Sequence, residues 1–245
     1  MFYLPNTPLW LRMIFPSGVV WKGDPTNKTV YLTFDDGPEP AVTQFVLDQL
    51  ASYNLKATFF CIGENVAKHP EMFEKVKAAG HRVGNHTMHH PNGWTTNNAA
   101  YVNEIMEAHQ LIQSDLFRPP YGKITQAQAK LLKSKELEID HNDISLLLSK
   151  SKVAGTGISK QILNVTGNRS DIRNERFQII MWSVIAGDFD ERIDGNVCYN
   201  HIVKHTNPGS IIVFHDSEKA FPRLKVALPK TLEWLTKEGY NPKLL

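Results

Sequence analysis

Two kinds of hydrophobic pattern alternate along the chain from residue 29 onward. Residues 29–34 form a run of β-branched and aromatic side chains that ends in Asp-Asp-Gly-Pro, which is typical of a buried strand entering a loop. Residues 41–52 instead repeat apolar side chains at helical spacing, from Val42 to Leu50. The same patterns predict further strands at 57–62, 81–83, 116–118, 178–185, 209–214 and 239–245, and helices at 64–79, 97–115, 125–133, 196–205 and 223–238.

This alternation predicts an α/β fold in which parallel strands are covered by helices. Six or seven strand–helix units in about 200 residues suit a closed barrel or a doubly wound sheet. In both architectures the functional side chains lie at the carboxyl ends of the strands, so these ends are where candidate chemistry is sought.

Two segments fall outside the alternation. Residues 1–28 carry many apolar side chains interrupted by prolines, and we expect them to form an arm that packs on the domain. Residues 135–176 are too long for an ordinary connection and are interpreted as an insertion. Because this insertion joins a helix to the next strand, we expect it at the amino ends of the strands, away from a site at the carboxyl ends.

Composition narrows the class of protein. Of the 245 residues, 42% are hydrophobic and 21% are charged, which provides for a sizeable core and excludes a disordered chain. The net charge of +2 does not indicate a nucleic-acid partner. Two cysteines are too few for a disulfide scaffold or a cysteine-based zinc site. Cys61 and Cys198 are expected to be small buried side chains, and a bond between them is left open.

The N-terminal sequence gives an expectation about location. No basic region precedes an apolar stretch, and Pro5, Pro8 and Pro16 interrupt the apolar residues, so neither a signal peptide nor a transmembrane segment is indicated. We therefore expect a cytoplasmic protein. Contact of the aromatic arm with a membrane surface is the less favoured alternative to packing on the domain.

Polar side chains recur where the predicted strands end. Asp35 and Asp36 follow the first strand, and His86 and His90 follow the third. The later strand ends carry the other candidates: Arg118, Asp188, His215 and Asp216. Because the carboxyl ends of parallel strands lie on one face of a barrel, these side chains are predicted to form a single site.

His86 and His90 have the spacing of a metal-ligand pair. Four residues apart on a helical turn, the two imidazoles would lie on one side and could bind the same ion, with His89 facing elsewhere. One aspartate would complete a set of two histidines and one carboxylate. Three protein ligands leave positions open for water and substrate, which is typical of a catalytic site. Zinc is the expected ion, with cobalt, nickel or iron as alternatives.

The two adjacent aspartates can have different roles. One can bind the metal, while the other stays ionised beside an arginine and serves as a base for the attacking water. His215 is a plausible proton donor to the leaving group, because histidine titrates near neutral pH.

Five ordered motifs resemble those of the polysaccharide deacetylases, the NodB-homology carbohydrate esterase family 4. The similar segments run from about residue 29 to 235, interrupted by the insertion. They are Thr33-Phe-Asp-Asp-Gly-Pro38, His86-Thr-Met-His-His90, Arg118-Pro-Pro-Tyr-Gly122, Gly187-Asp188-Phe189 and Val213-Phe-His-Asp216.

The resemblance implies a catalytic domain over residues 29–245, folded as a distorted (β/α) barrel of about seven parallel strands. It implies metal-dependent hydrolysis of N-acetyl, or O-acetyl, groups on an acetylated carbohydrate that contains amino sugars. Carried over by motif, the resemblance makes Asp36, His86 and His90 the metal ligands and Asp35 the base.

The resemblance also assigns the remaining candidates. His215 would be the acid, held in its proton-donating form by Asp188, and Arg118 would orient Asp35. The backbone N–H of Tyr121 would help to stabilise the oxyanion. The expected substrate contacts are Val213 in the acetyl pocket, Phe189 and Pro119.

Three positions depart from the family pattern. Phe189 stands where tryptophan is usual, and Val213 replaces a leucine. Ile185 occupies a position where many members carry an acidic residue. None of these changes removes an expected catalytic group, so they bear on substrate preference.

Two other functions remain as alternatives. One is a hydrolase of cyclic amides or imides on the same barrel, and the other is a carbohydrate-binding pseudoenzyme. The acetylated saccharide, the identity of the metal and the oligomeric state are left open by the sequence.

Overall fold

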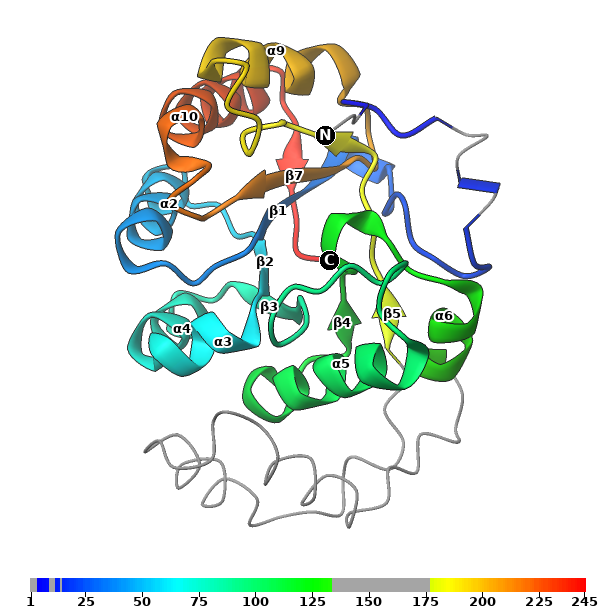
Figure 1. Cartoon of the computed structure of the whole chain (residues 1–245). Coiled ribbons are helices and arrows are strands. Elements are labelled where there is room, and N and C mark those ends of the chain that lie inside the picture. The colour runs from blue at the N-terminus through cyan, green and yellow to red at the C-terminus, as the bar shows by residue number, and fades with distance from the viewer. Residues whose placement is uncertain (1–3, 9–11, 14, 134–176) are drawn as a thin grey trace.

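A computed structural model describes residues 4–8, 12–13, 15–133 and 177–245, and Figure 1 shows its arrangement. Seven parallel strands form one curved sheet in the order β5-β4-β3-β2-β1-β7-β6, and β8 pairs with the start of β1. The prediction of a distorted barrel of about seven parallel strands is confirmed. The strands are β1 Thr29–Asp35, β2 Thr58–Cys61, β3 Arg82–Asn85, β4 Leu116–Phe117, β5 Gln178–Ile179, β6 Val184–Ile185, β7 Ile211–His215 and β8 Asn241–Pro242.

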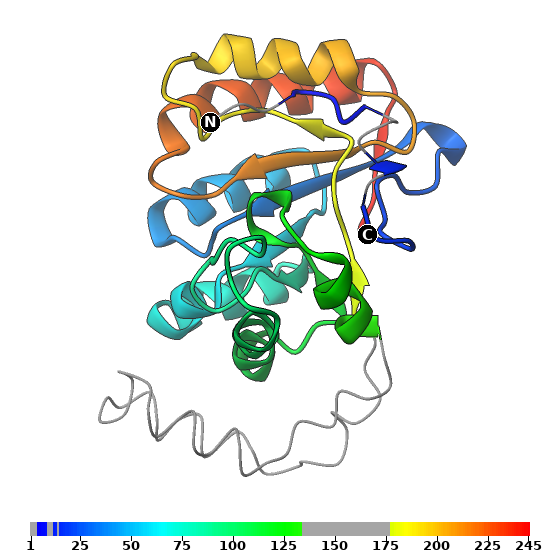
Figure 2. The same cartoon turned by 45° about the vertical axis from the view of Figure 1, so that its right-hand side comes forward.

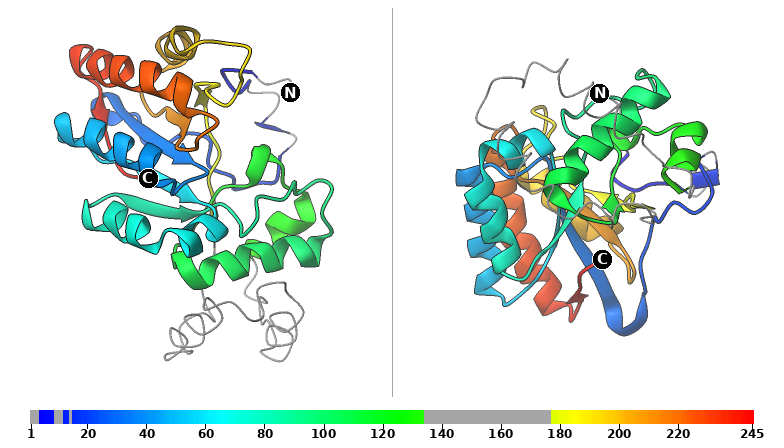
Figure 3. Two further views of the ribbon diagram at one scale, coloured as in Figure 1. Left: turned by 60° about the vertical axis from the view of Figure 1, so that its left-hand side comes forward. Right: turned by 90° about the horizontal axis from the view of Figure 1, so that it is seen from below.

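Helices cover the outer face of the sheet. In Figures 2 and 3, α9 lies beside α10, and α10, α2 and α4 follow one another along that face. The helices are α2 Pro40–Ser52, α3 Gly63–Lys68, α4 Pro70–Ala78, α5 Asn98–Ile112, α6 Gln126–Lys133, α9 Gly195–His205 and α10 Phe221–Lys237. Two short 3₁₀ turns are η1 Thr26–Lys28 and η2 Pro120–Gly122.

The central strand β1 separates the core from the inside of the barrel. All seven of its residues are buried, and its side chains alternate between the two faces. Val30, Leu32 and Phe34 join the main hydrophobic core under the helices. Thr33 and Asp35 face the inside, where both contact the guanidinium of Arg118. The inner face of the sheet therefore holds polar groups that lead to its carboxyl end.

The apolar run 178–185 corrects one prediction. Instead of one strand it forms two short strands, β5 and β6, at opposite edges of the sheet. The residues between them cross the inside of the barrel, where the carbonyls of Ile180 and Met181 accept hydrogen bonds from Arg118. An apolar extended segment needs no neighbouring strand when a buried side chain satisfies its backbone.

Helix 64–79 was also predicted as one element and is two. The structure ends α3 at Lys68 and begins α4 at Pro70, with His69 in a non-helical conformation between them. Proline fits the first position of a helix and breaks one in its interior, so Pro70 was the available signal.

Described parts of the N-terminal segment lie along the edge of the sheet. The N–H of Ile185 donates to the carbonyl of Pro5, and Thr7 donates to the carbonyl of Ser183. Val20 pairs with Ile180 in parallel. Whether 1–28 and 29–245 are separate units stays a prediction, and the insertion at 135–176 lies outside the described residues.

Both cysteines are buried and free, Cys61 in β2 and Cys198 in α9, and both belong to the main core. This confirms that they act as small core side chains. Within the described parts of the chain, no helix is long and apolar enough to cross a bilayer. The cytoplasmic location stays a prediction.

Candidate active site

The side chains singled out at the strand ends meet at the carboxyl end of the sheet. Asp35 ends β1 and His215 ends β7, and the two residues are register partners on neighbouring strands. His86 follows β3, Arg118 follows β4, and Asp188 comes shortly after β6. The predicted convergence of five strand ends is therefore observed.

Asp36, His86 and His90 form a group that can hold a metal ion. One potential ligand atom from each lies within 4.8 Å of the others, the only such group among the described residues. Oδ1 of Asp36 is 3.7 Å from Nε2 of His86 and 3.4 Å from Nε2 of His90. Two imidazole nitrogens and one carboxylate oxygen suit zinc and its first-row neighbours.

The two histidines do not lie on a helical turn, which corrects that prediction. Residues 86–90 form a loop, in which Thr87 has φ 69° and His90 has φ 58°. Asp36, with φ 82°, is held in the same unusual region. Such backbone conformations are costly for non-glycine residues and recur at functional sites. Here the loop brings together side chains that a helix was expected to bring together.

Hydrogen bonding and burial prepare His86 as a ligand. Its Nδ1–H donates to the carbonyl of Arg118 at 2.7 Å, which leaves the lone pair of Nε2 toward Asp36. Burial lowers the pKa of His86 to about 3. Burial, followed by the proximity of His86, lowers the pKa of His90 to about 4. Both imidazoles are therefore neutral near pH 7, as metal binding requires.

His89, between the two, is turned away from this group. It is exposed, and its Nδ1 lies 3.0 Å from Oε1 of Glu104 on α5. The sequence prediction that His89 faces elsewhere agrees with this position.

Asp35 is paired with a fully buried arginine. Nη1 of Arg118 donates to Oδ1 of Asp35 at 2.6 Å and to Oγ1 of Thr33 at 2.8 Å. The guanidinium also lies 4.0 Å from the centre of the Phe60 ring. Burial lowers the pKa of Arg118, with the charge of Asp35 opposing the shift. The carboxylate of Asp35 is thus held in a fixed orientation beside a permanent cation.

His215 is oriented by Asp188. Its Nδ1–H donates to Oδ1 of Asp188 at 2.7 Å, and its backbone N–H donates to Oδ2 at 2.8 Å. Nε of Arg223 donates to the carbonyl of Asp188, which fixes that residue in turn. Burial lowers the pKa of His215, but the charge and hydrogen bond of Asp188, with Asp36 and Asp35, outweigh it and raise the pKa to about 9. His215 therefore carries a proton at neutral pH.

The predicted substrate contacts surround these groups. The exposed ring of Tyr121 lies 4.5 Å from the ring of His90, in a turn where Tyr121 has φ 58°. Phe189 contacts the ring of His215 edge to face. Pro119 and Val213 are buried, Val213 completely. Their assignment to substrate stays a prediction.

One residue of the site was given no role by the sequence. Asp216 is buried, its Oδ1 accepts the N–H of Gly37 at 3.1 Å, and its Oδ2 accepts the hydroxyl of Thr43 at 2.6 Å. A Cβ on Gly37 would lie 2.1 Å from this carboxylate, so only glycine fits there. Burial raises the pKa of Asp216 to about 8, against the hydrogen bond from Thr43. The only sequence signal for this role was its position directly after His215.

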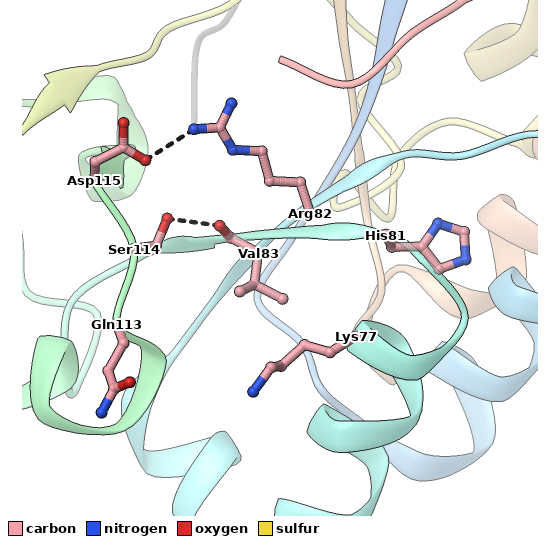
Figure 4. A pocket seen from close by; sticks show the side chains of 7 residues that line it. All are labelled: Lys77, His81, Arg82, Val83, Gln113, Ser114 and Asp115. Carbon is pink, nitrogen blue, oxygen red and sulfur yellow. Dashed lines mark hydrogen bonds and ion pairs between the residues drawn. The ribbon is translucent and has the colours of Figure 1, made fainter.

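A separate hollow lies at the opposite, amino-terminal end of the strands. Figure 4 shows it between β3 and the start of β4, with Arg82 paired to Asp115 at 2.8 Å. The residues that line it are Lys77, His81, Arg82, Val83, Gln113, Ser114 and Asp115. None of the candidate catalytic or metal-binding residues is among them.

Comparison with known proteins identifies the family. A family model described as polysaccharide deacetylase matches residues 22–139. A peptidoglycan-N-acetylglucosamine deacetylase of Bacillus cereus is 30% identical over 233 residues, which are 92% of this chain and 91% of the relative. The chain belongs to the polysaccharide deacetylase family, and the predicted family and class of enzyme are confirmed.

Two further comparisons bear on fold and substrate. The crystal structure of a peptidoglycan N-acetylglucosamine deacetylase bound to 4-naphthalen-1-yl-N-oxidanyl-benzamide matches with a TM-score of 0.72 and 26% identity, over 98% of this chain and 95% of that one. A chitooligosaccharide deacetylase of Bradyrhizobium is 43% identical over 107 residues, which are 41% of this chain and 49% of the relative.

Several relatives are longer than this chain. It spans 66% of another peptidoglycan-N-acetylglucosamine deacetylase of Bacillus cereus, and 38% of one from Listeria monocytogenes.

Proposed function

We propose that the protein removes the N-acetyl group from N-acetylglucosamine units of a glycan, with a divalent metal ion bound by Asp36, His86 and His90. The observation that carries this proposal is the arrangement at the carboxyl end of the sheet. A three-ligand group lies among a fixed carboxylate, Asp35, and a protonated imidazole, His215. Amide hydrolysis needs both a proton acceptor and a proton donor.

The ligand group fits a divalent ion on its own chemistry. The two imidazoles are neutral, the Nε2 lone pair of His86 is directed by the hydrogen bond at Nδ1, and Asp36 adds a negative charge. When bound, a divalent ion supplies Lewis-acid polarisation of the acetyl carbonyl and lowers the pKa of a water molecule. Zinc is the proposed ion, and cobalt, nickel and iron suit the same donors.

Asp35 is the proposed general base. Arg118 stabilises its ionised form and fixes the position of its Oδ1. The carboxylate would accept the proton of the attacking water. Arg118 cannot take part as an acid because its guanidinium keeps its proton at all working pH values.

His215 is the proposed general acid. The amine that leaves as the C–N bond breaks must gain a proton, and the Nε2–H of a protonated His215 can supply it. Asp188 acts as a positioning residue, because its hydrogen bond directs Nδ1–H inward and keeps the imidazolium charged.

Backbone and apolar groups complete the proposal. The N–H of Tyr121, in its left-handed turn, would donate to the oxygen on which negative charge develops, a contact typically worth about 3 kcal/mol. Phe189, Val213 and Pro119 are the proposed apolar contacts of the acetyl group and sugar. The relatives support N-acetylglucosamine as the acetylated unit, since they are named for peptidoglycan and chitooligosaccharide.

Metal analysis and acetate release test the proposal together. The purified protein is stripped with a chelator, reloaded with one equivalent of zinc, and incubated with chitotetraose and with peptidoglycan glycan strands. Release of acetate that is lost on stripping and restored on reloading is the expected result. Tight zinc binding without acetate release from either glycan would instead favour a carbohydrate-binding pseudoenzyme or a hydrolase of another substrate.

A further inference from the structure

An exposed aromatic surface begins beside the candidate active site. Within the described part of the chain two aromatic side chains are largely exposed, Trp94 at 58% and Tyr121 at 46%. The ring of Tyr121 contacts the ring of His90, one of the proposed metal ligands. Lys123 lies between the two aromatics, with Nζ 5.2 Å from the centre of the Trp94 ring and 5.9 Å from that of Tyr121. These three residues, the rim surface, therefore extend outward from His90.

The position of Trp94 is fixed by the turn that carries it. Its backbone N–H donates to Oδ1 of Asn92, and its indole N–H donates to the carbonyl of Ile124. Nε2 of Gln128 on α6 donates to the carbonyl of Gly93 at 2.8 Å. Gly93 packs so closely on the carbonyl of Lys123 that a Cβ would lie 2.3 Å from that oxygen. An exposed indole held in this way is preorganised for binding.

The chemistry of the rim surface indicates its ligand. Flat aromatic faces beside a deacetylase site suit the C–H face of a sugar ring, because they bury apolar area while the hydroxyls stay in water. The ammonium of Lys123 adds a positive charge, and no carboxylate of the described residues forms a salt bridge with it. The site itself presents the carboxylates of Asp35, Asp36 and Asp188. An acidic glycan would be repelled there unless a cation on the rim met its charge.

We infer that Trp94, Tyr121 and Lys123 form a subsite for the sugar next to the one that is deacetylated, and that this sugar carries a carboxylate. The inference rests on the proposed function and refines its substrate. The carboxylate is the lactyl group of N-acetylmuramic acid, which alternates with N-acetylglucosamine in the glycan strand of peptidoglycan. Trp94 and Tyr121 stack on the sugar, and Lys123 pairs with the lactyl carboxylate.

Three tetrasaccharides separate stacking from charge. The first is chitotetraose, the second is the peptide-free alternating tetrasaccharide of N-acetylglucosamine and N-acetylmuramic acid, and the third is the second with its lactyl carboxyls converted to amides. The second and third differ only in charge. For the zinc-loaded protein, kcat/KM is measured by acetate release, and Kd is measured by calorimetry.

Lys123→Gln is the decisive variant. An exposed ion pair is worth up to about 1 kcal/mol, so the ratio of kcat/KM for the acidic to the amidated tetrasaccharide should fall about five-fold. Lys77→Gln is a matched control, because Nζ of Lys77 also lies 5.2 Å from an aromatic ring, that of Phe73, at the opposite end of the strands. This control should leave the ratio unchanged. A ratio unaffected by Lys123→Gln overturns the subsite.

Trp94→Ala should lower kcat/KM on all three tetrasaccharides by about ten-fold, since an aromatic stack contributes about 1 kcal/mol, and Trp94→Phe should restore most of it. Equal activity of Trp94→Ala and the unmodified protein would contradict the stacking role. If the zinc-loaded protein releases no acetate from any tetrasaccharide, the proposed function fails. The Kd ratio of acidic to amidated ligand in the protein and in Lys123→Gln then decides the subsite on its own.

Discussion

The two ends of the parallel sheet both carry buried histidines with lowered pKa values, and the histidines are arranged for opposite purposes. At the carboxyl end, Nδ1–H of His86 donates to the carbonyl of Arg118, and Nε2 is left with its lone pair toward Asp36. At the amino end, Nδ1 of His81 already accepts the backbone N–H of Ala57 at 3.1 Å. Burial, with the charge of Lys56, lowers the pKa of His81 to about 4.

The difference lies in what is done with the lone pair. A buried neutral histidine next to a strand is a structural hydrogen-bond acceptor when a backbone N–H occupies its lone pair. It is a candidate metal ligand when the lone pair points at other donors. Position and pKa alone do not separate the two cases, since both ends share them. The predictions below test this distinction in order of decreasing expected effect.

The largest effect is expected for His90→Ala. With one of three protein ligands removed, the site should lose tight zinc binding, and acetate release should be abolished. His89→Ala is the matched control, since His89 is the neighbouring residue and pairs with Glu104 outside the group. Zinc content after dialysis and kcat are measured for both. One tightly bound zinc per chain in His90→Ala would exclude His90 as a ligand.

Asp35→Asn is expected to separate metal binding from turnover. The amide cannot accept a proton, so kcat should fall by about 10²–10⁴-fold, while zinc stays bound because Asp36 and the histidines are intact. Zinc content and kcat are measured on the same preparation. A kcat close to that of the unmodified protein would show that Asp35 is not the base.

Much of this carboxyl end could be predicted from the sequence, because its chemistry is local. Asp35 and Asp36 directly follow an apolar strand, and parallel strands bring such positions together whatever their exact length. The backbone of the site could not be predicted in the same way. The spacing of His86 and His90 suits a helical turn, whereas the structure uses a loop with left-handed residues, which is a result of tertiary packing.

Apolar pattern alone also failed where partners were distant. The run 178–185 is uniformly apolar, but its middle residues are satisfied by Arg118, 62 and 63 positions earlier in the chain. Asp216 had no visible role because its partners, Gly37 and Thr43, are more than 170 positions away. Long-range hydrogen bonds of this kind leave no periodic signal.

A more moderate effect is expected for Asp188→Asn. Asp188 raises the pKa of His215, so neutralising it should lower that pKa from about 9. The acid form exists below the pKa, and the alkaline limb of the profile of kcat/KM against pH should therefore move to lower pH. Zinc content should not change. An alkaline limb at the same pH in both proteins would show that His215 is not the titrating acid.

The smallest effect on activity is expected at the amino end. In the folded protein His81 stays neutral down to about pH 4, against an ordinary pKa of 6.5. Its contribution to stability is therefore complete above pH 6.5 and is lost as pH falls toward 4. His81→Asn removes this titration. Between those pH values, the free energy of unfolding should fall less steeply, by up to about 1.4 kcal/mol per pH unit.

Urea unfolding at several pH values measures that slope, with kcat/KM at pH 7 as the control. The control should be unchanged, because His81 lies at the end of the strands remote from the candidate site. An unchanged slope together with a large loss of activity would reverse the assignment of the two ends.

The strand order has a consequence for how the chain is made. β1 is the first strand of the sheet to be synthesised, and one of its neighbours, β7, begins only at Ile211, whose partner in β1 is Tyr31. During vectorial synthesis β1 must therefore wait beside β2 with one edge open until most of the polypeptide exists. Contacts of such long range are slow to form, and an open strand edge is prone to pair with other chains. A nascent chain that stops before β7 would hold Asp35 and Asp36 without His215, so cellular folding helpers have most to protect in this interval.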